Sequence, residues 1–598
     1  MSPWAGLPGL QIKPLNVGAP GAFQLGEEHN MKRTLYLALA LSVAGCGFGQ
    51  TKAGPVKGSI PGPTAPDFNV TNPLTPVKVV VQFSASPNAS LLSAFTGKGA
   101  TINKKFSHFP KVQVFTVPAG MVNLIAKLPG VKYVSPDRSV KPRLDLTAAT
   151  VGSNYAVSQY NLTGQGIGVA VLDSGIDSTN ADLAGRVVYS EDFTGEGTTA
   201  DRFGHGTHVA GIIGGSGANS GGLYRGIAPG VNLLNLRVLD ENGNGTDSAI
   251  IAAIDRAISL QSTYNIRVLN LSLGRPIYET FVADPLCQAV EAAYQAGIVV
   301  VVAAGNGGRD NSAGTDGYAT IEAPANDPFV ITVGAMKTEG TPTKADDLIA
   351  SYSSKGPTVV DSFVKPDLVA PGNLIKSLRV PGSTLDLEYP GNQVNPTLYG
   401  APANAPVAYM TMNGTSMATP TVSGAAAILL QQNAAMTPDQ VKARLMLTAS
   451  KSFPTSSIAT DPDTQVQYTA YYDVFTVGAG YLDVLAAINS TALADGTAPS
   501  PVAVYDSSSN TFSMVNANQV VWGDQVVWGD QVVWGDQVVW GDQVVWGDQV
   551  VWGDQLVLSS SVPAAQSNTT AFHTIWASSS SWANFNPGSL STNMKGEK

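Results

Sequence analysis

Five continuous apolar segments of strand length recur along the middle of this chain, separated by stretches with helical character. They are 167–172, 231–238, 268–272, 298–303 and 330–333. Strands that are apolar on both faces belong to a parallel sheet covered by helices on both sides. Side chains that follow such strands meet at the carboxyl edge of the sheet, where ligands bind. The pattern therefore predicts an α/β fold with a mostly parallel sheet and functional residues at that edge.

The size and composition of the chain narrow its class. At 598 residues it is longer than a usual single domain, so we expect several domains. Hydrophobic residues make up 44% of the chain and charged residues only 13%, which favours a compact protein over a disordered one. The net charge of −10 argues against general nucleic-acid binding.

Three short segments each place one reactive side chain among glycines and small residues. They are Val-Leu-Asp173-Ser-Gly-Ile-Asp, Gly-His205-Gly-Thr-His-Val-Ala-Gly and Asn-Gly-Thr-Ser416-Met-Ala-Thr-Pro. A serine hydroxyl becomes a useful nucleophile when a histidine takes its proton and a carboxylate orients that histidine. Asp173 follows an apolar strand directly, and His205 and Ser416 each open a predicted helix. His208 fits no zinc motif, so we interpret it as a packing residue.

The residues around these three positions resemble the subtilisin-like serine protease family (subtilases, peptidase S8). The resemblance implies a three-layer α/β fold and a secreted serine endopeptidase that acts through an acyl-enzyme intermediate. It implies that Asp173, His205 and Ser416 are catalytic and that the chemistry requires no cofactor. Asn306 lies in Ala-Ala-Gly-Asn-Gly after an apolar strand and matches the family's side-chain oxyanion donor. The backbone N–H of Ser416 matches the second donor.

The same resemblance indicates where a peptide substrate binds. Two segments match those that flank an extended substrate, namely Gly243, Asn244 and Gly245, and Ser272, Leu273 and Gly274. Strand addition uses backbone hydrogen bonds, so side-chain pockets decide specificity. The walls supplied by Leu273–Gly274 and by Ala303, Ala304 and Gly305 are apolar. This favours cleavage after medium-sized or large uncharged residues.

Asp182 matches a calcium ligand of the family, which implies a structural calcium ion. The segment 216–224, which would complete such a site, does not match the usual pattern. An ordinary surface aspartate is therefore the alternative interpretation of Asp182.

The segment 77–143 is predicted to be an inhibitory propeptide. It contains ten basic residues and one acidic residue, whereas 144–598 contains 19 basic and 40 acidic residues. Strands are predicted at 77–83, 112–117 and 131–134, with helices at 88–96 and 119–128. This alternation resembles the small α/β propeptide (inhibitor I9 type) of subtilases, which implies intramolecular inhibition and self-cleavage near Arg143–Leu144. A nucleic-acid-binding arm and an unrelated α/β domain are the alternatives.

The first 50 residues contain a signal for export. Met31-Lys-Arg precedes a short apolar run and small residues, the pattern of a signal peptide, and Met31 is the expected true start. The ending Val-Ala-Gly-Cys46 resembles a bacterial lipoprotein box, which implies a lipid anchor at Cys46; ordinary signal cleavage is the alternative. Residues 51–76 are predicted to be a linker. We expect an extracytoplasmic bacterial location, with Cys287 left as a single buried thiol in a helix at 285–294.

After the catalytic domain, expected at 144–490, a β-type extension is predicted at 491–598. It contains the repeat Val-Val-Trp-Gly-Asp-Gln at 519–555. Val-Val-Trp favours strands and Gly-Asp favours turns, so we expect a short-strand meander or a solenoid-like stack. Three roles stay open: attachment to a cell surface or carbohydrate, an assembly edge, or no specific role.

Two other functions are weighed against an active endopeptidase. One is an adhesion protein on an inactive scaffold of the same fold, which the intact Asp173, His205, Asn306 and Ser416 disfavour. The other is a processing protease of narrow specificity, which acid-lined substrate pockets would favour. The substrate segments matched above contain no acidic residue.

Overall fold

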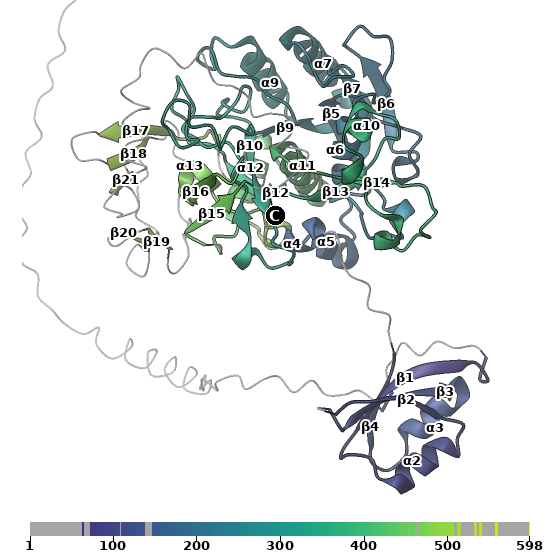
Figure 1. The fold of residues 1–598 in the computed structure, drawn as a ribbon. Coiled ribbons are helices and arrows are strands. Elements are labelled where there is room, and N and C mark those ends of the chain that lie inside the picture. Colours follow the sequence, from purple (N-terminus) through teal and green to yellow (C-terminus); the bar gives the residue numbers. More distant parts are fainter. Residues whose placement is uncertain are drawn as a thin grey trace, which may run out of the picture. The chain divides into compact units, whose positions relative to one another are not determined.

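The computed structural model describes residues 63–64, 72–107, 109–137, 146–452, 454–461, 464–494, 496–506, 511–515, 532–534, 538–540, 556–559 and 597. The chain divides into two compact units, 1–140 and 141–598, coloured along the sequence in Figure 1. No helix among the described residues combines the length and apolarity needed to cross a membrane. The predicted signal peptide and Cys46 lie outside the described residues.

The N-terminal unit is a four-stranded antiparallel sheet with helices on one face. Its elements are β1 (Pro76–Phe83), α2 (Ala89–Thr96), β2 (Thr101–Lys105), β3 (Val112–Pro118), α3 (Val122–Ala126) and β4 (Val131–Pro136), in the sheet order β2-β3-β1-β4. Phe83, Phe95 and Phe115 pack with ring centroids 4.7 to 6.2 Å apart in its core. The predicted strands and helices are present. The sequence analysis missed β2, because this edge strand is almost wholly exposed and its sequence Thr-Ile-Asn-Lys-Lys is polar.

The second unit is built on an eight-stranded, mostly parallel sheet. Seven strands follow the order β11-β10-β9-β8-β5-β7-β6, and β12 pairs with β10. All these pairs are parallel except β10 with β11. The strands are β5 (Gly168–Asp173), β6 (Val187–Asp192), β7 (Asn232–Arg237), β8 (Ile266–Leu271), β9 (Val299–Ala303), β10 (Ile331–Lys337), β11 (Leu348–Ile349) and β12 (Leu368–Pro371).

Helices cover both faces of this sheet and give it three layers. Along β5, Val169 and Val171 contribute to one hydrophobic core, whereas Ala170 and Leu172 contribute to another. On the first side lie α6 (His205–Gly214) and α11 (Thr415–Gln432); on the second lie α7 (Asp247–Ser259) and α9 (Pro285–Gln295), which Figure 1 shows side by side. The predicted α/β fold with a mostly parallel sheet is therefore confirmed.

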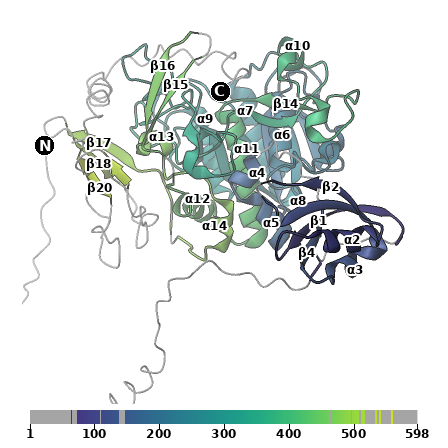
Figure 2. The same ribbon diagram turned by 60° about the horizontal axis from the view of Figure 1, so that its bottom comes forward.

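Shorter helices close the first layer. They are α4 (Thr147–Thr150), α5 (Ser153–Tyr160), α12 (Pro438–Leu447) and α14 (Val484–Asn489), and Figure 2 shows α12, α14 and α5 grouped beside α11. The remaining helices are α8 (Gln261–Tyr264), α10 (Thr384–Glu388) and α13 (Val474–Val477). Two antiparallel hairpins complete this unit: β13 (Ile375–Leu378) with β14 (Tyr409–Met412), and β15 (Ser456–Thr460) with β16 (Gln467–Tyr471).

The C-terminal extension contains short antiparallel strands. β17 (Val502–Asp506), β18 (Thr511–Val515) and β21 (Leu556–Ser559) form one sheet, and β19 (Val532–Trp534) pairs with β20 (Val538–Trp540). β19 and β20 are the Val-Val-Trp segments of two successive hexapeptide repeats, and they pair antiparallel. The other repeats lie outside the described residues.

Candidate active site

Asp173 and His205 form a hydrogen-bonded pair at the carboxyl edge of the sheet. Asp173 is the last residue of β5, and His205 is the first residue of α6. The Nδ1 atom of His205 donates to Oδ1 of Asp173 over 2.8 Å. Burial lowers the pKa of His205, but the charge and hydrogen bond of Asp173, together with the charge of Asp201, raise it overall. The pair therefore favours the protonated imidazole and leaves Nε2 available on the other side of the ring.

A second buried carboxylate, Asp201, holds the loop that carries His205. It accepts hydrogen bonds from the backbone N–H groups of Gly204 (2.6 Å) and Thr207 (2.8 Å). It also accepts from the hydroxyl of Ser174, 2.8 Å away, and that hydroxyl accepts from Gly206 N–H. Burial raises the pKa of Asp201, while these hydrogen bonds oppose the shift. Asp201 was not predicted from the sequence. The available signal was its position four residues before His205, just before a helix begins.

Gly206 allows α6 to approach β5 closely. A Cβ atom at Gly206 would overlap the carbonyl oxygen of Gly175 and lie 3.0 Å from Cβ of Asp173. Any side chain here would push α6 away from β5 and lengthen the hydrogen bond from Asp173 to His205.

Ser416 is the second residue of α11 and contacts Ser272. Its hydroxyl donates to the carbonyl oxygen of Ser272 over 3.1 Å, while the hydroxyl of Ser272 donates to the carbonyl oxygen of Ser416 over 2.9 Å. In the described part of the chain the Ser416 hydroxyl makes no hydrogen bond to His205. Catalytic hydrogen bonds are often formed only when substrate is bound.

Pro420 is the sixth residue of α11 and lies beyond its first turn. Proline lacks an N–H group, so it cannot serve the carbonyl oxygen of Ser416 four residues earlier. The Ser272 hydroxyl supplies that missing hydrogen bond. The proline is therefore accommodated by a contact between the segment that carries Ser416 and a predicted substrate segment.

Asn306 follows β9 and lies against the start of α11. Its Oδ1 accepts a hydrogen bond of 3.0 Å from the backbone N–H of Thr415. Because Oδ1 is engaged, the Nδ2 group is the part of the amide that can donate to a ligand. The hydroxyl of Thr415 also receives the N–H of Gly305 at 3.3 Å, which fixes this turn to α11.

Exposure distinguishes the predicted reactive residues from their surroundings. His205, Asn306 and Ser416 are each partly exposed, whereas the residue before and the residue after each of them is buried. Each side chain therefore reaches an accessible surface from an otherwise rigid, buried backbone.

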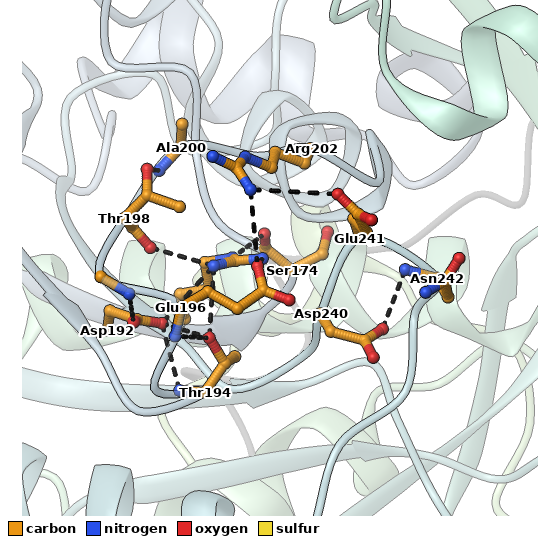
Figure 3. Close-up of polar contacts among 12 residues, drawn as sticks. Ser174, Asp192, Thr194, Glu196, Thr198, Ala200, Arg202, Asp240, Glu241 and Asn242 are labelled. Atoms are coloured by element: carbon orange, nitrogen blue, oxygen red, sulfur yellow. Dashed lines mark hydrogen bonds and ion pairs between the residues drawn. The ribbon is translucent and has the colours of Figure 1, made fainter.

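The predicted substrate segments extend from the carboxyl ends of neighbouring strands. Gly243–Gly245 follows β7, Ser272–Gly274 follows β8, and Ala303–Gly305 ends β9 and continues beyond it. The carboxylate of Asp240 accepts from the N–H groups of Asn242 (2.8 Å; Figure 3) and Asn244 (2.9 Å) and shapes the first segment. The topology therefore brings all three segments to the edge that carries Asp173.

A buried arginine fixes the loop beside Asp173. Arg237, the last residue of β7, is fully buried and donates to the carbonyl oxygens of Ser174 (3.1 Å) and Thr198 (3.0 Å). It also pairs with Glu196 at 2.5 Å. The sequence analysis missed this contact, because Arg237 lies within a strand and its partners lie 39 to 63 residues earlier in the chain.

Asp182, matched from the sequence to a calcium ligand, uses both carboxylate oxygens in hydrogen bonds within the chain. Asp182 is buried, with Oδ1 accepting from the N–H of Asn219 (2.8 Å) and Oδ2 from the hydroxyl of Tyr409 (2.7 Å). Calcium takes six to eight oxygen ligands. The described residues contain no group of three or more His, Cys, Asp or Glu side chains that could hold a metal. The Asp182 carboxylate is instead engaged by donors of the chain itself.

His208 and Cys287 lie in the interior. His208 is completely buried with Nε2 3.2 Å from the carbonyl oxygen of Met410; burial, aided by the charge of His205, lowers its pKa to about 3. Cys287 is buried in α9 and donates to Asn326 over 3.2 Å, and burial raises the pKa of its thiol. These environments suit packing residues.

Comparisons with known proteins place residues of the second unit in a known family. The family described as the Subtilase family matches residues 164–537. Serine protease AprX of Bacillus subtilis (strain 168) is 39% identical over 352 residues, which cover 58% of this chain and 75% of AprX. Subtilisin E of the same organism is 34% identical, covering 63% of this chain and 86% of the relative. An extracellular serine proteinase of Thermus sp. (strain Rt41A) is 33% identical, covering 58% and 73% respectively.

Proposed function

Because the chain belongs to the subtilase family and is a serine endopeptidase, we propose that Asp173, His205 and Ser416 form its catalytic triad. The observation that supports this most strongly is the 2.8 Å hydrogen bond from His205 to the buried Asp173. That bond fixes the ring so that Nε2 can accept a proton. Asp173 also stabilises the imidazolium that forms during the reaction, in keeping with the raised pKa of His205.

The proposed reaction begins when the Ser416 hydroxyl turns from Ser272 to His205. Oγ of Ser416 attacks the carbonyl carbon of the substrate as Nε2 of His205 takes its proton. His205 then gives that proton to the departing amine, and the acyl group stays on Ser416. A water molecule, deprotonated by His205, attacks the acyl-enzyme and releases the second product. Catalysis requires no cofactor.

Asn306 and the backbone N–H of Ser416 are proposed to bind the oxyanion. Asn306 lies beside Thr415, so its Nδ2 group and the first turn of α11 can reach the same oxygen atom. N–H groups in the first turn of a helix have no carbonyl partner within that helix, and the positive end of the helix dipole lies there. Donors fixed in advance stabilise the developing charge without reorganising.

We propose that residues 77–143 are an inhibitory propeptide and that the enzyme removes it itself. The division of the structure at 140/141 supports a domain boundary close to Arg143–Leu144. The excess of basic residues before this boundary and of acidic residues after it supports electrostatic association of the two parts.

Secretion is proposed from the signal peptide and from the relatives. One relative is named an extracellular proteinase. Lipid attachment at Cys46 is proposed as a stage that precedes removal of the propeptide.

Expression of the wild type and of Ser416→Ala, followed by mass spectrometry of the N-termini, tests this function. We expect the wild type to begin near Leu144 and the variant to retain residues 77–143. When active wild type is added to the variant, it should cleave residues 77–143 from the variant. A wild type that is unprocessed and hydrolyses no protein would contradict the proposal.

A further inference from the structure

Glu322 lies between the two predicted substrate walls, Leu273–Gly274 and Ala303–Gly305, although it belongs to neither of them. Its backbone N–H donates to the carbonyl oxygen of Ala304 over 3.2 Å. The next residue, Ala323, forms a two-way backbone bridge with Arg275, with distances of 2.8 and 3.0 Å. Glu322 is thus fixed between the ends of β9 and β8, 48 residues beyond Gly274 in the sequence.

Gly274 and Gly305 have no Cβ atom, and the Glu322 side chain occupies the space where those atoms would lie. A Cβ atom at Gly274 would lie 2.5 Å from Oε2 and 3.0 Å from Cβ of Glu322. A Cβ atom at Gly305 would lie 2.9 Å from both Cγ and Cδ. The carboxylate therefore lies directly against the backbone of both walls. Gly274 is exposed and Glu322 is partly exposed between two buried neighbours, so this position is accessible from solvent.

The Glu322 carboxylate has no partner of its own. Within the described part of the chain it makes no hydrogen bond and no ion pair, and burial alone raises its pKa to about 7. The guanidinium of the adjacent Arg275 is already held by Asp247 (2.9 Å) and Asp284 (2.8 Å). A carboxylate that is partly removed from water and unpaired gains free energy from a cationic ligand.

The walls also identify which substrate residue would reach Glu322. Ser272, directly before the first wall, contacts the hydroxyl of Ser416 at 3.1 Å, and Gly305, in the second wall, directly precedes Asn306. The side chain that enters between them belongs to the residue whose carbonyl is attacked. Leu273, which is partly exposed, would pack against the methylene groups of an arginine or lysine side chain, and Glu322 would bind its charged end.

On the basis of the proposed function, we propose that Glu322 is a specificity-determining residue that selects arginine or lysine on the acyl side of the cleaved bond. This differs from the sequence-based expectation of uncharged residues, which considered the apolar walls alone. The proposal therefore favours a processing protease of narrow specificity over an endopeptidase of broad specificity.

The test compares peptide substrates that differ only in the residue before the cleaved bond: arginine, lysine, leucine or glutamate. For the wild type we expect kcat/KM to be on the order of 10- to 100-fold higher for arginine than for leucine, as for one charge-assisted hydrogen bond. Glu322→Gln should lose most of this preference while retaining cleavage after leucine. Glu279 is an exposed glutamate five residues after Gly274 in the sequence; Glu279→Gln removes the same charge and should retain the wild-type preference.

A second measurement needs no variant. Peptide aldehydes ending in argininal or leucinal are compared as inhibitors of the wild type, and we expect the argininal to bind more tightly by a similar factor. Equal kcat/KM for arginine and leucine, or a preference unchanged in Glu322→Gln, would overturn the assignment of Glu322 and leave the proposed function intact. Absence of hydrolysis of every peptide by a processed wild type would instead contradict the proposed function, and with it this inference.

Discussion

The hydroxyl of Ser272 donates a 2.9 Å hydrogen bond to the carbonyl oxygen of Ser416, the oxygen that Pro420 leaves without a helical donor. One side chain directly after β8 thereby completes the first turns of α11 and holds the segment that carries Ser416. The same contact joins a substrate segment to the proposed catalytic serine.

Ser272→Ala should therefore destabilise the protein by about 1–3 kcal/mol, the cost of a buried acceptor without a donor. Pro420→Ala restores an N–H group that can serve the Ser416 carbonyl, so the loss should be smaller in that background. This coupling is measured by urea unfolding of Ser272→Ala, Pro420→Ala and the double variant. All three proteins also carry Ser416→Ala, which prevents self-digestion. If Ser272→Ala lost the same free energy of unfolding with and without Pro420→Ala, this role of Ser272 would be contradicted.

Asn306→Ala should lower kcat with little change in KM. Removal of a side-chain oxyanion donor in related proteases costs on the order of 10²–10³ in turnover, and we expect a similar loss here. Steady-state kinetics on one peptide give both constants. A large rise in KM at constant kcat would assign Asn306 to ground-state binding instead.

The pH profile reports on the pair of His205 and Asp173. His205 must be neutral to accept the proton of Ser416, and its pKa is raised. With a leucine substrate, kcat/KM should therefore rise with pH around a midpoint above about 6.5, the ordinary histidine value. In Asp173→Asn the charge that raises the pKa is lost, so the midpoint should move to lower pH and kcat should fall on the order of 10⁴-fold. An unchanged midpoint would refute the role of Asp173.

Asp201→Ala removes the acceptor of three hydrogen bonds, from the N–H groups of Gly204 and Thr207 and from the hydroxyl of Ser174. We expect a loss of about 1–3 kcal/mol in the free energy of unfolding. We also expect a lower kcat, and a pH midpoint below that of the wild type, because the charge of Asp201 also raises the pKa of His205. Asp255→Ala, at an exposed position of α7, is the matched control. If only stability changed, Asp201 would be a structural residue without influence on His205.

The buried strands could be predicted because each is a continuous apolar run. β5, β7, β8, β9 and β10 were predicted from such runs. β6 was missed, because it is a half-exposed edge strand with the polar ending Ser-Glu-Asp. β12 was missed as well, since its four residues give too short a signal.

The site was predictable only where reactive residues and their glycines adjoin in sequence. Asp173, His205, Asn306 and Ser416 each lie in such a motif. Arg237 and Glu322 do not, because their partners come from segments brought together by the order of the strands. The contact of Glu322 with Gly274 exists only after β8 and β9 pair, and no local pattern encodes it.

Covalent labelling of the nucleophile tests the central claim most directly. The processed wild type is incubated with a fluorophosphonate, which reacts with activated serines, and the labelled peptide is identified by mass spectrometry. We predict one label per molecule on Ser416, loss of all endopeptidase activity in proportion to labelling, and no labelling of Ser416→Ala or His205→Ala. Full peptidase activity in a protein labelled at Ser416, or in Ser416→Ala itself, would contradict the account.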